Sequence, residues 1–500
     1  MKQAWLPDLI YTGRRFESGL ALVCDDQGRI AKLARAEEVK DLPISRLKNR
    51  ALLPGMVNAH SHAFQRVLRG RTEWRDDNNP GDFWTWREMM YSAATRLTPE
   101  DIYDASRMAF LEMILGGITA VGEFHYIHLA PDGKPYEDPN LLAHQVVRAA
   151  GNVGLRIALL RVAYARAGYQ TEQNPQQARF IESDPETYLK NVESLMADLN
   201  HNPHSAFRIP QSEAWVGVAP HSVRAVPLDY LRQVIAYANE RDLPTHMHVA
   251  EQPAEVSDCI EEYGRTPVAL LESEGLLSER FTGIHMIHIT PKAPPVLARA
   301  GATVCACPTT ERNLGDGVVP ADEFLRHGVR VCLGTDSHAQ IDLLEDAREL
   351  EYHLRLQKLE RAILGKPGGR TQQAGGRSPT FRESEKQRSE IRGQRSDAGA
   401  SALAARLFDC ATINGALSIG ANSGKLEPGQ PADFFTVDLN DSSIAGSSPG
   451  DLLSSIVFSL SRTAVRDVFV GGKQIVDDRR HPSQEGIIQR FNTLQKRLWG

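Results

Sequence analysis

Short apolar runs alternate with longer amphipathic stretches through the middle of the 500-residue chain. Apolar runs that end in turn-forming residues are typical of buried parallel strands. Amphipathic stretches such as residues 227–239 and 343–358 are typical of helices that cover a sheet. The predicted strands lie in ALLPGMVNAHSH, GITAVGEF, GLRIALLRVAY, AWVGVAPHSV, PTHMHVAE, FTGIHMIHIT, GATVCACPTT and VRVCLGTDSH. Eight strands alternating with helices predict an α/β fold with a (β/α)8 TIM-like barrel.

The two chain ends have a different pattern. Residues 9–33 alternate apolar patches with glycine and aspartate turn signals, as a small antiparallel sheet would. Residues 429–439 and 465–478 repeat this pattern of short strands around glycine or proline. We therefore predict a small β-sandwich domain formed by both chain ends. The predicted units are residues 1–53 (first part of the β-sandwich), 54–422 (barrel) and 423–500 (second part of the β-sandwich).

Residues 365–400 interrupt the barrel pattern. This segment is rich in glycine, arginine, serine and glutamine and has almost no large apolar residues. Such a composition cannot bury enough surface to offset the entropy lost on ordering, so we predict a disordered insertion. A basic patch for nucleic acid is the alternative, but runs of charge are usually solvated.

The overall composition changes this picture little and excludes several classes of function. The chain is 41% hydrophobic and 24% charged, with a net charge of -6, which argues against binding a phosphate backbone. It has neither an apolar run of the ~20 residues that a membrane span needs nor an apolar signal at its start. Six scattered cysteines without a C-x-x-C pair favour a reduced, cytoplasmic protein. We expect no nucleic-acid or membrane partner.

Histidines and acids follow several of the predicted strands. His60 and His62 are two residues apart and face the same side of an extended segment, so both can bind one divalent metal such as zinc. Taken alone, the pair could equally be two polar loop residues. The active groups of such barrels lie at the carboxyl ends of the strands, where further candidates also fall. These are His246, His248, Glu251, His285, His288 and Asp336. Their common location predicts a shared metal site.

The residue types at these strand ends suggest a reaction. Three histidines and an aspartate leave room for a water on a single Zn²⁺, which lowers the pKa of that water toward ~7. Asp336 can take the proton of this water, and Glu251 can pass a proton to a nitrogen of the substrate. His285 can steady the water or the developing charge. This set suits hydrolysis at a carbon–nitrogen centre with ammonia as the leaving group.

At this point the sequence resembles the amidohydrolase superfamily. The segments PGMVNAHSH, HVAE, H-x-x-H and GTDSH occur in its order, and ATINGALSIG precedes the return to the β-domain. Within it, the chain resembles the formimidoylglutamate deiminase family, which hydrolyses N-formimino-L-glutamate to N-formyl-L-glutamate and ammonia in histidine degradation. The segments that carry this resemblance are NAHSHAFQRVLRGRTE, FWTWREMMY, GITAVGEFHYIH, APHSVRAV, HMHVAEQ, CPTTERNLGDG and LGTDSHAQIDLLEDARELEYHLRL.

The resemblance assigns a role to each matching position. It implies the metal ligands His60, His62, His248 and Asp336 and the catalytic groups Glu251, His285 and Asp336. It implies the substrate contacts Gln65, Arg87, Tyr126, His221 and Arg224. The position of the catalytic histidine relative to the metal aspartate in relatives selects His285 over His288. The family also suggests a homodimer, while Glu123 and His125 stay without a role.

The implied substrate contacts are physically reasonable. The substrate carries two carboxylates, and arginine is suited to binding carboxylate bidentately, although any single arginine is more often a surface residue. Some relatives place a carbamylated lysine, which bridges two metal ions, in the strand that corresponds to AWVGVAPHSV. This segment contains no lysine, which favours a site with one metal ion. The insertion at 365–400 and the form of GIHMIHIT depart from the family pattern without affecting the predicted chemistry.

Two alternative functions stay open at this stage. The first is another deaminase of the superfamily that acts on a heterocycle, which would need stacking surfaces rather than paired arginines. The second is a non-catalytic barrel that binds a ligand and uses the metal structurally. Four protein ligands can close a structural zinc site, but Glu251 and His285 would then have no purpose.

Overall fold

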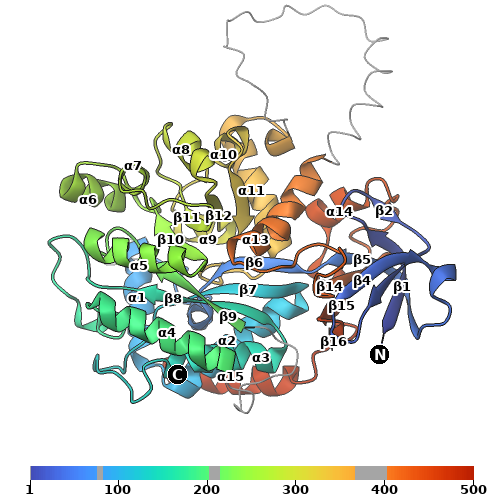
Figure 1. Cartoon of the computed structure of the whole chain (residues 1–500), viewed down its shortest axis with the longest axis horizontal. Helices are drawn as coiled ribbons and strands as arrows, with labels where there is room; N and C mark the ends of the chain where they lie inside the picture. Colours follow the sequence, from blue (N-terminus) through green and yellow to red (C-terminus); the bar gives the residue numbers. More distant parts are fainter. Residues whose placement is uncertain (1, 76–82, 202–213, 366–401) are drawn as a thin grey trace, which may run out of the picture.

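The computed structural model describes residues 2–75, 83–201, 214–365 and 402–500. Apart from residue 365, the predicted insertion at 365–400 lies outside the described residues. Eight parallel strands form the central barrel (Figure 1). They are β6 Met56–Ser61, β7 Ile118–His125, β8 Arg156–Ala163, β9 Ala214–Pro220, β10 Thr245–Val249, β11 Phe281–His285, β12 Thr303–Ala306 and β13 Arg330–Leu333.

The barrel strands pair in sequence order and nearly close into a ring. A bridge between Ser61 and Asp336 links the end of β6 to the segment after β13. All residues of β7 and β8 are buried, because the interior covers one face of these strands and helices cover the other. Each of the eight predicted strand segments contains one barrel strand, which confirms the predicted barrel.

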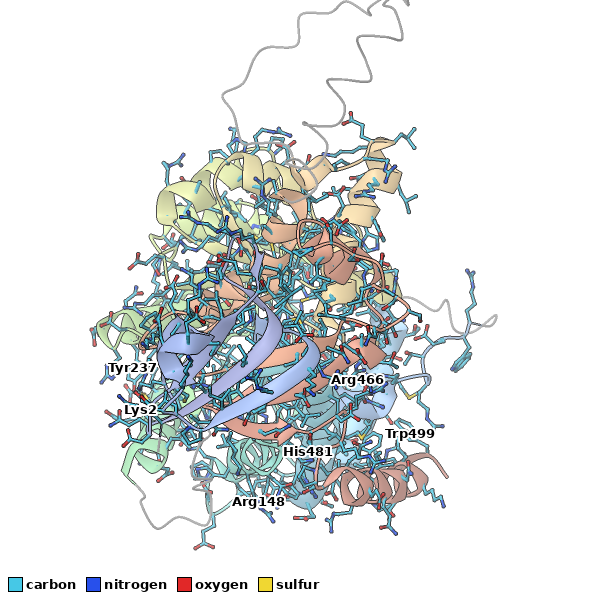
Figure 2. All side chains as sticks on the ribbon, turned by 90° about the vertical axis from the view of Figure 1, so that its right-hand side faces the viewer. Lys2, Arg148, Tyr237, Arg466, His481 and Trp499 are labelled. Carbon is cyan, nitrogen blue, oxygen red and sulfur yellow. The ribbon has the colours of Figure 1, made fainter. Side chains whose placement is uncertain are left out.

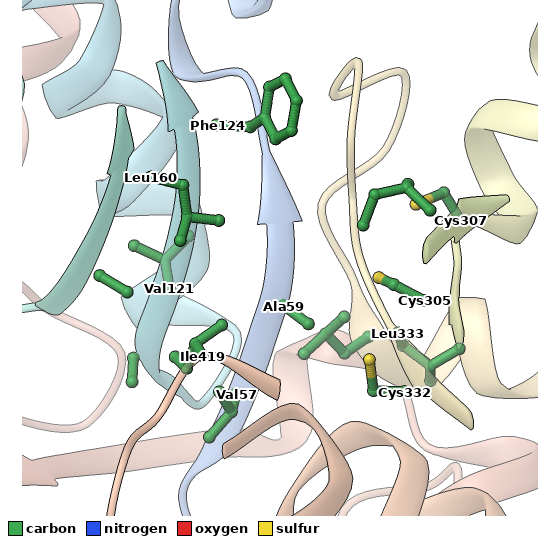
Figure 3. Packing of buried hydrophobic residues seen from close by; sticks show 14 of the residues in the cluster. Val57, Ala59, Val121, Phe124, Leu160, Cys305, Cys307, Cys332, Leu333 and Ile419 are labelled. Carbon is green, nitrogen blue, oxygen red and sulfur yellow. The ribbon is translucent and has the colours of Figure 1, made fainter. Parts of the chain in front are cut away.

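Small and branched side chains pack closely at the seam between β6 and β13. Figure 3 shows Ala59 and Leu333 beside the cysteines of the neighbouring strands. Cys305 and Cys332 are directly opposite each other in the register of β12 and β13. At Gly334 an added Cβ would lie 2.6 Å from the Cβ of His60. Glycine therefore allows the end of β13 to approach the segment that carries the first histidines.

Helices surround the barrel, and local sequence signals explain where they begin and end. The side chain of Asp342 accepts hydrogen bonds from the amides of Leu344 and Glu345 and so caps α11, which ends before the left-handed Leu359. The helices α5 and α11 coincide with the two amphipathic stretches predicted. The helices include α1 Phe83–Arg96, α2 Pro99–Leu115, α3 Leu141–Val153, α4 Pro185–His201, α5 Leu228–Glu240, α6 Pro253–Tyr263, α7 Pro267–Ser273, α8 Ala293–Ala300, α9 Pro308–Leu314, α10 Ala321–Arg326, α11 Leu343–Lys358, α13 Ile413–Ser418, α14 Leu452–Ser459 and α15 Gln484–Trp499.

Both chain ends contribute to one separate mixed sheet beside the barrel (Figures 1 and 2). Its strands are β1 Gln3–Tyr11, β2 Phe16–Glu17, β3 Leu20–Cys24, β4 Ile30–Arg35, β5 Ile44–Pro54, β14 Phe434–Asp438, β15 Val465–Val470 and β16 Lys473–Val476. The strand β5 joins the two ends, because it pairs with β1 in parallel and with β14 in antiparallel orientation. Trp5, Phe434 and Phe469 pack together in its core, with the two phenylalanine rings 4.3 Å apart. The predicted β-domain from both ends is confirmed.

The chain returns to the barrel after this sheet. The C-terminal helix α15 lies along α2, where Arg490 contacts Asp104 at 2.8 Å and Arg497 pairs with Asp101. The guanidinium of Arg96 stacks 4.7 Å from the ring of Trp499, which Figure 2 labels. Among the described residues, no helix combines the length and apolar character needed to cross a membrane.

Candidate active site

Four predicted metal ligands converge at the carboxyl ends of the barrel strands. His60 lies in β6, His62 follows it, His248 lies in β10 and Asp336 follows β13. All four side chains are buried, and their ligand atoms lie within 4.8 Å of one another. We call these four residues the metal side of the barrel mouth.

The spacing of these atoms fits a metal ion. Nε2 of His60 lies 3.2 Å from Nε2 of His248, and Oδ1 of Asp336 lies 3.3 Å from His60 Nε2 and 3.2 Å from His62 Nε2. Ligands around a tetrahedral centre with bonds of about 2.0 Å are about 3.3 Å apart. The donor set therefore matches one small divalent cation in both chemistry and spacing.

Hydrogen bonds from the outer ring nitrogens orient two of the imidazoles. Nδ1 of His62 bonds the carbonyl oxygen of Phe124 at 2.9 Å, and Nδ1 of His248 bonds that of His221 at 3.1 Å. Each bond leaves Nε2 free to face the centre. Burial lowers the pKa of His60 to about 3, so its ring stays neutral.

Asp336 complements these neutral rings as an anion. Burial opposes its ionisation, but the contacts with His60 and His62 keep its pKa well below the usual value. Its backbone is locked to the same segment, because Asp336 N donates to the carbonyl of His60 and His62 N donates to the carbonyl of Asp336, both at 3.1 Å. Its φ of 44° is a left-handed conformation that non-glycine residues rarely adopt. The local backbone therefore holds Asp336 in an unusual conformation that turns its carboxylate to the histidines.

Glu251 and His285 lie beside the metal side. Nε2 of His285 is 3.6 Å from Oε1 of Glu251 and 3.7 Å from Oδ2 of Asp336. Burial raises the pKa of Glu251. For His285, burial alone would lower the pKa, but the surrounding carboxylates, Glu251 foremost, raise it to about 10. The pKa values of both groups are therefore raised, and each binds a proton more readily than the free side chain does.

The other two strand-end histidines point elsewhere. His288 bonds the carbonyl oxygen of Asp316 through Nε2 at 2.9 Å. His246 lies two residues before His248 in β10, but its ring bonds the carbonyl oxygen of Ser418 at 2.8 Å. The structure thus brings His285, and neither of these, next to Asp336.

Three predicted substrate contacts adjoin the metal side. Gln65 donates from Nε2 to the hydroxyl of Tyr126 at 2.7 Å. The ring of Tyr126 lies 5.0 Å from that of His62, and the ring of His221 lies 4.9 Å from that of His248. The buried Oε1 of Gln65 has no hydrogen-bond partner among the described residues. An unused acceptor at this position can receive a donor from a bound molecule.

The two predicted arginines lie next to this group. Arg87, on α1, stacks 4.4 Å from the ring of Trp84, while Arg224 donates to the carbonyl oxygen of Ala167 at 3.0 Å. Burial, together with the nearby charge of Arg224, lowers the pKa of Arg87. Within the described part of the chain, neither guanidinium forms an ion pair with a carboxylate. We call Arg87 and Arg224, with Gln65, Tyr126 and His221, the arginine side.

Comparison with known proteins agrees with this geometry. A model of the amidohydrolase family matches residues 51–475. This chain belongs to the amidohydrolase family. It is 36% identical over 443 residues to a formimidoylglutamate deiminase of Pseudomonas aeruginosa, covering 88% of each chain. It is 27% identical over 431 residues to a 5-methylthioadenosine/S-adenosylhomocysteine deaminase of Natronomonas pharaonis, covering 86% of this chain and 82% of the relative. A crystal structure of an amidohydrolase from Brucella melitensis superposes with a TM-score of 0.83 at 30% identity, covering both chains completely.

This amidohydrolase has a buried polar network behind its metal side that sequence reasoning left unassigned. Glu123 accepts hydrogen bonds from the hydroxyl of Ser61 at 2.5 Å and from the amide of Ala63 at 2.7 Å. The Ser61 hydroxyl also lies 3.1 Å from Nε2 of His338, whose Nδ1 is 3.1 Å from the hydroxyl of Thr335. Burial raises the pKa of Glu123 to about 7. The network ties β7 and the end of β13 to the segment between His60 and His62.

A second residue, Glu311, was missed entirely. It follows β12 on α9, is 1% exposed, and contacts the ring of His285. The only signal for it in the sequence is its position after a predicted barrel strand, within CPTTERNLGDG. For His125, the ring lies 5.5 Å from that of His128, and no contact to the metal side is present among the described residues.

Proposed function

We propose that this amidohydrolase hydrolyses N-formimino-L-glutamate to N-formyl-L-glutamate and ammonia, a step of histidine degradation. The main observation that supports this proposal is the pair Arg87 and Arg224. These two guanidinium groups lie near the metal side and form no ion pair with a carboxylate among the described residues. A substrate with two carboxylates supplies the missing anions. The 36% identical relative with this named activity supports the same substrate.

One divalent metal, which we propose to be Zn²⁺, would be held by His60, His62, His248 and Asp336. When bound, it supplies Lewis acidity that makes hydroxide available near neutral pH. Histidine and carboxylate ligands also suit other divalent ions, so metal analysis of the purified enzyme decides between them.

The remaining steps use groups of this chain. Asp336 accepts the proton of the attacking water through Oδ2, the oxygen that faces His285. The imidazole of His285 stabilises the charge that develops as the formimino carbon becomes tetrahedral. Glu251 passes its proton to the imino nitrogen, and Asp336 then passes on the proton that it took from the water. The nitrogen leaves as ammonia, and the hydroxyl proton returns to Glu251 as the carbon becomes the formyl group. The raised pKa of Glu251 suits this donor role.

The arginine side positions the amino-acid part of the substrate. In this proposal Arg87 and Arg224 bind the two carboxylates, and Gln65, Tyr126 and His221 provide hydrogen bonds between them and the metal side. The expected partner is thus a small anionic molecule. We also propose a homodimer, which light scattering of the purified protein tests directly.

The decisive experiment compares substrates. We expect ammonia release from N-formimino-L-glutamate to exceed that from adenosine and guanine derivatives in kcat/KM. Preferential turnover of the heterocycles would instead support the second candidate, a heterocycle deaminase. That candidate is favoured by the 27% identical relative and by the ring of Tyr164 at 4.6 Å from His221. Full activity in metal-binding Glu251→Ala and Asp336→Ala variants would point to a non-catalytic barrel.

A further inference from the structure

The imidazole of His285 is engaged at both nitrogens. Nε2 faces Glu251 and Asp336 at 3.6 and 3.7 Å, and Nδ1 lies 3.1 Å from Oε1 of Glu311. Both His285 and Glu311 are almost fully buried, with 0% and 1% exposure. A buried carboxylate so close to a ring nitrogen is a strong acceptor for an N–H donor.

The carboxylate of Glu311 is held in place by its own helix. The amide of Cys307, which precedes α9, donates to the same Oε1 at 2.8 Å, and the amide of Glu311 donates back to the carbonyl of Cys307 at 2.9 Å. The first bond lets the Glu311 side chain satisfy the free amide of the N-cap residue, and the second is the first backbone bond of the helix itself. Glu311 therefore has a fixed position that does not depend on His285.

The same helix is fastened to the segment that carries Asp336. The hydroxyl of Thr310 donates to the carbonyl of Thr335 at 3.2 Å and accepts from the amide of Ser337 at 3.2 Å. Glu311 and Asp336 are thus parts of one connected unit, and His285 lies between them. Movement of this helix would change both contacts of the ring together.

The backbone conformation of His285 leaves the orientation of its ring to be fixed by side-chain contacts. It ends β11 with a φ of 68°, a left-handed conformation, and Met286 follows with a φ of 53°. Because strand pairing ends here, the sheet fixes the position of Cα but leaves rotation of the ring about its side-chain bonds. A 180° rotation about the Cβ–Cγ bond would put Cδ2 in the place of Nδ1 and Cε1 in the place of Nε2, so that the carboxylates would face carbon atoms.

We infer that Glu311 is a positioning residue for His285, accepting the Nδ1–H hydrogen bond and thereby directing Nε2 at Glu251 and Asp336. This inference rests on the catalytic role proposed for His285. A second metal ion bound by His285, Cys307 and Glu311 is the competing explanation, since their ligand atoms also lie within 4.8 Å of one another. The hydrogen bond is favoured because Oε1 of Glu311 already accepts a backbone amide.

The test uses the metal-loaded enzyme and the variants Glu311→Leu, Glu311→Gln and His285→Gln. Glu311→Leu removes the acceptor, and we expect kcat to fall about 10- to 100-fold, part of the factor that a positioned proton-handling or charge-stabilising side chain contributes. KM stays within about twofold because the arginine side is intact. Glu311→Gln keeps an acceptor oxygen and restores most of kcat.

Glu351→Leu is the matched control for loss of a buried carboxylate. Glu351 lies on α11, is also fully buried, and accepts backbone amides of Ile363 and Leu364, both at 3.0 Å. We expect it to lower thermal stability as much as Glu311→Leu does while leaving kcat unchanged. An equal fall of kcat in both variants would overturn the inference, because a general loss of stability would then explain it.

A double-mutant cycle separates positioning from a purely structural role. If Glu311 acts through His285, adding Glu311→Leu to His285→Gln changes the residual kcat by less than about twofold. The full 10- to 100-fold loss in that background would contradict the inference. Binding of a second equivalent of metal that is lost in the Glu311→Leu variant would also contradict the inference, and it would support a second metal site.

A measurement without substrate keeps this test independent of the proposed function. In the ¹⁵N-histidine-labelled enzyme, we expect a hydrogen-bonded imidazole N–H proton signal that disappears in His285→Gln and Glu311→Leu and persists in Glu311→Gln and Glu351→Leu. Persistence in Glu311→Leu would overturn the inference. Lack of turnover of N-formimino-L-glutamate by the wild type would refute the proposed function alone, while this signal still decides the hydrogen bond.

Discussion

The metal side and the arginine side of the barrel mouth balance their charges in different ways. On the metal side, the carboxylate of Asp336 lies within 3.3 Å of His60 and His62, and its pKa is held well below the usual value. On the arginine side, Arg87 and Arg224 repel each other, and the described residues provide no ion-pair partner for either. The metal side has its charge partners in direct contact. On the arginine side the charges of Glu251 and Glu255 reach Arg224 only from a distance.

A third arginine, outside the arginine side, shows a buried guanidinium whose charge is balanced by the protein. Arg161, fully buried in β8, is held by Glu182 at 2.5 and 3.1 Å and by Asn140 at 3.0 Å. Leaving a buried charge without a partner costs several kcal/mol, so a chain usually supplies one. The contrast with Arg161 supports the proposal that Arg87 and Arg224 bind an anionic ligand. In that proposal the metal side determines the reaction and the arginine side the substrate.

The largest effect is expected from Asp336→Asn on the metal side. The substitution keeps the size of the side chain but removes the charge that faces both histidines. We expect metal content to fall and kcat for ammonia release to drop at least about 10³-fold, because metal binding and the general base are both impaired. An active, metal-loaded variant would remove the basis for calling this side catalytic.

Glu251→Gln should separate chemistry from metal binding. Glu251 lies beside the metal side and outside the four-residue ligand cluster. We expect kcat to fall about 10²–10⁴-fold, the range for loss of a general acid, with metal content unchanged. Steady-state kinetics and metal analysis on one preparation check both points, and a loss of metal here would mean that the four-residue cluster is incomplete.

Arg87→Met tests the arginine side with a smaller effect. A hydrogen-bonded contact to a charged group contributes about 1.5–3 kcal/mol, so kcat/KM for N-formimino-L-glutamate should fall about 10- to 100-fold. N-formiminoglycine, which has one carboxylate fewer, provides the matched substrate. We expect its kcat/KM to change less than that of the dicarboxylate in one of the two variants, Arg87→Met or Arg224→Met. Equal losses for both substrates in both variants would argue against a separate site for each carboxylate.

The two sides also differ in how far the sequence predicts them. The strand-end rule gathers His60, His62, His248 and Asp336 among a wider set of candidates, because an apolar run and the polar residue after it are local signals. The resemblance to the family selects these four as ligands. Glu311 escaped prediction since its role depends on which ring nitrogen of His285 it meets, a contact between distant segments. The pairing of Arg161 with Glu182, and the lack of such a partner for Arg87, likewise depend on tertiary structure.

The same physical limit applies to the fold. The eight barrel strands and the helices α5 and α11 could be predicted from local periodicity. The strand β5 could not, because its first half is largely polar and exposed and gains its place only by pairing with β1 and β14. The packing of α15 on α2 depends on ion pairs between residues nearly 400 positions apart. The domain boundaries at 53 and 422 stay predictions.

The smallest effect concerns the balanced pair Arg161 and Glu182. Burial opposes ionisation of Glu182, but Arg161 and further hydrogen bonds lower its pKa to about 2. An unfolded glutamate has a pKa of about 4.3, so the folded state binds the proton more weakly than the unfolded state. The pair therefore stabilises the fold above pH ~4.3, and this contribution, about 3 kcal/mol, is lost as the pH falls toward ~2.

The substitution Glu182→Gln tests this comparison, because it leaves the guanidinium of Arg161 without a carboxylate partner, as is the case for Arg87 among the described residues. Urea unfolding of the metal-free proteins should show the variant less stable than the wild type by about 3 kcal/mol near neutral pH. The difference should narrow as the pH is lowered from ~4.3 toward ~2, since the wild-type carboxylate then becomes protonated as well. A difference that is constant with pH would show that Glu182 acts through packing alone. In that case a missing carboxylate would also be a weaker argument for an anion bound by Arg87 and Arg224.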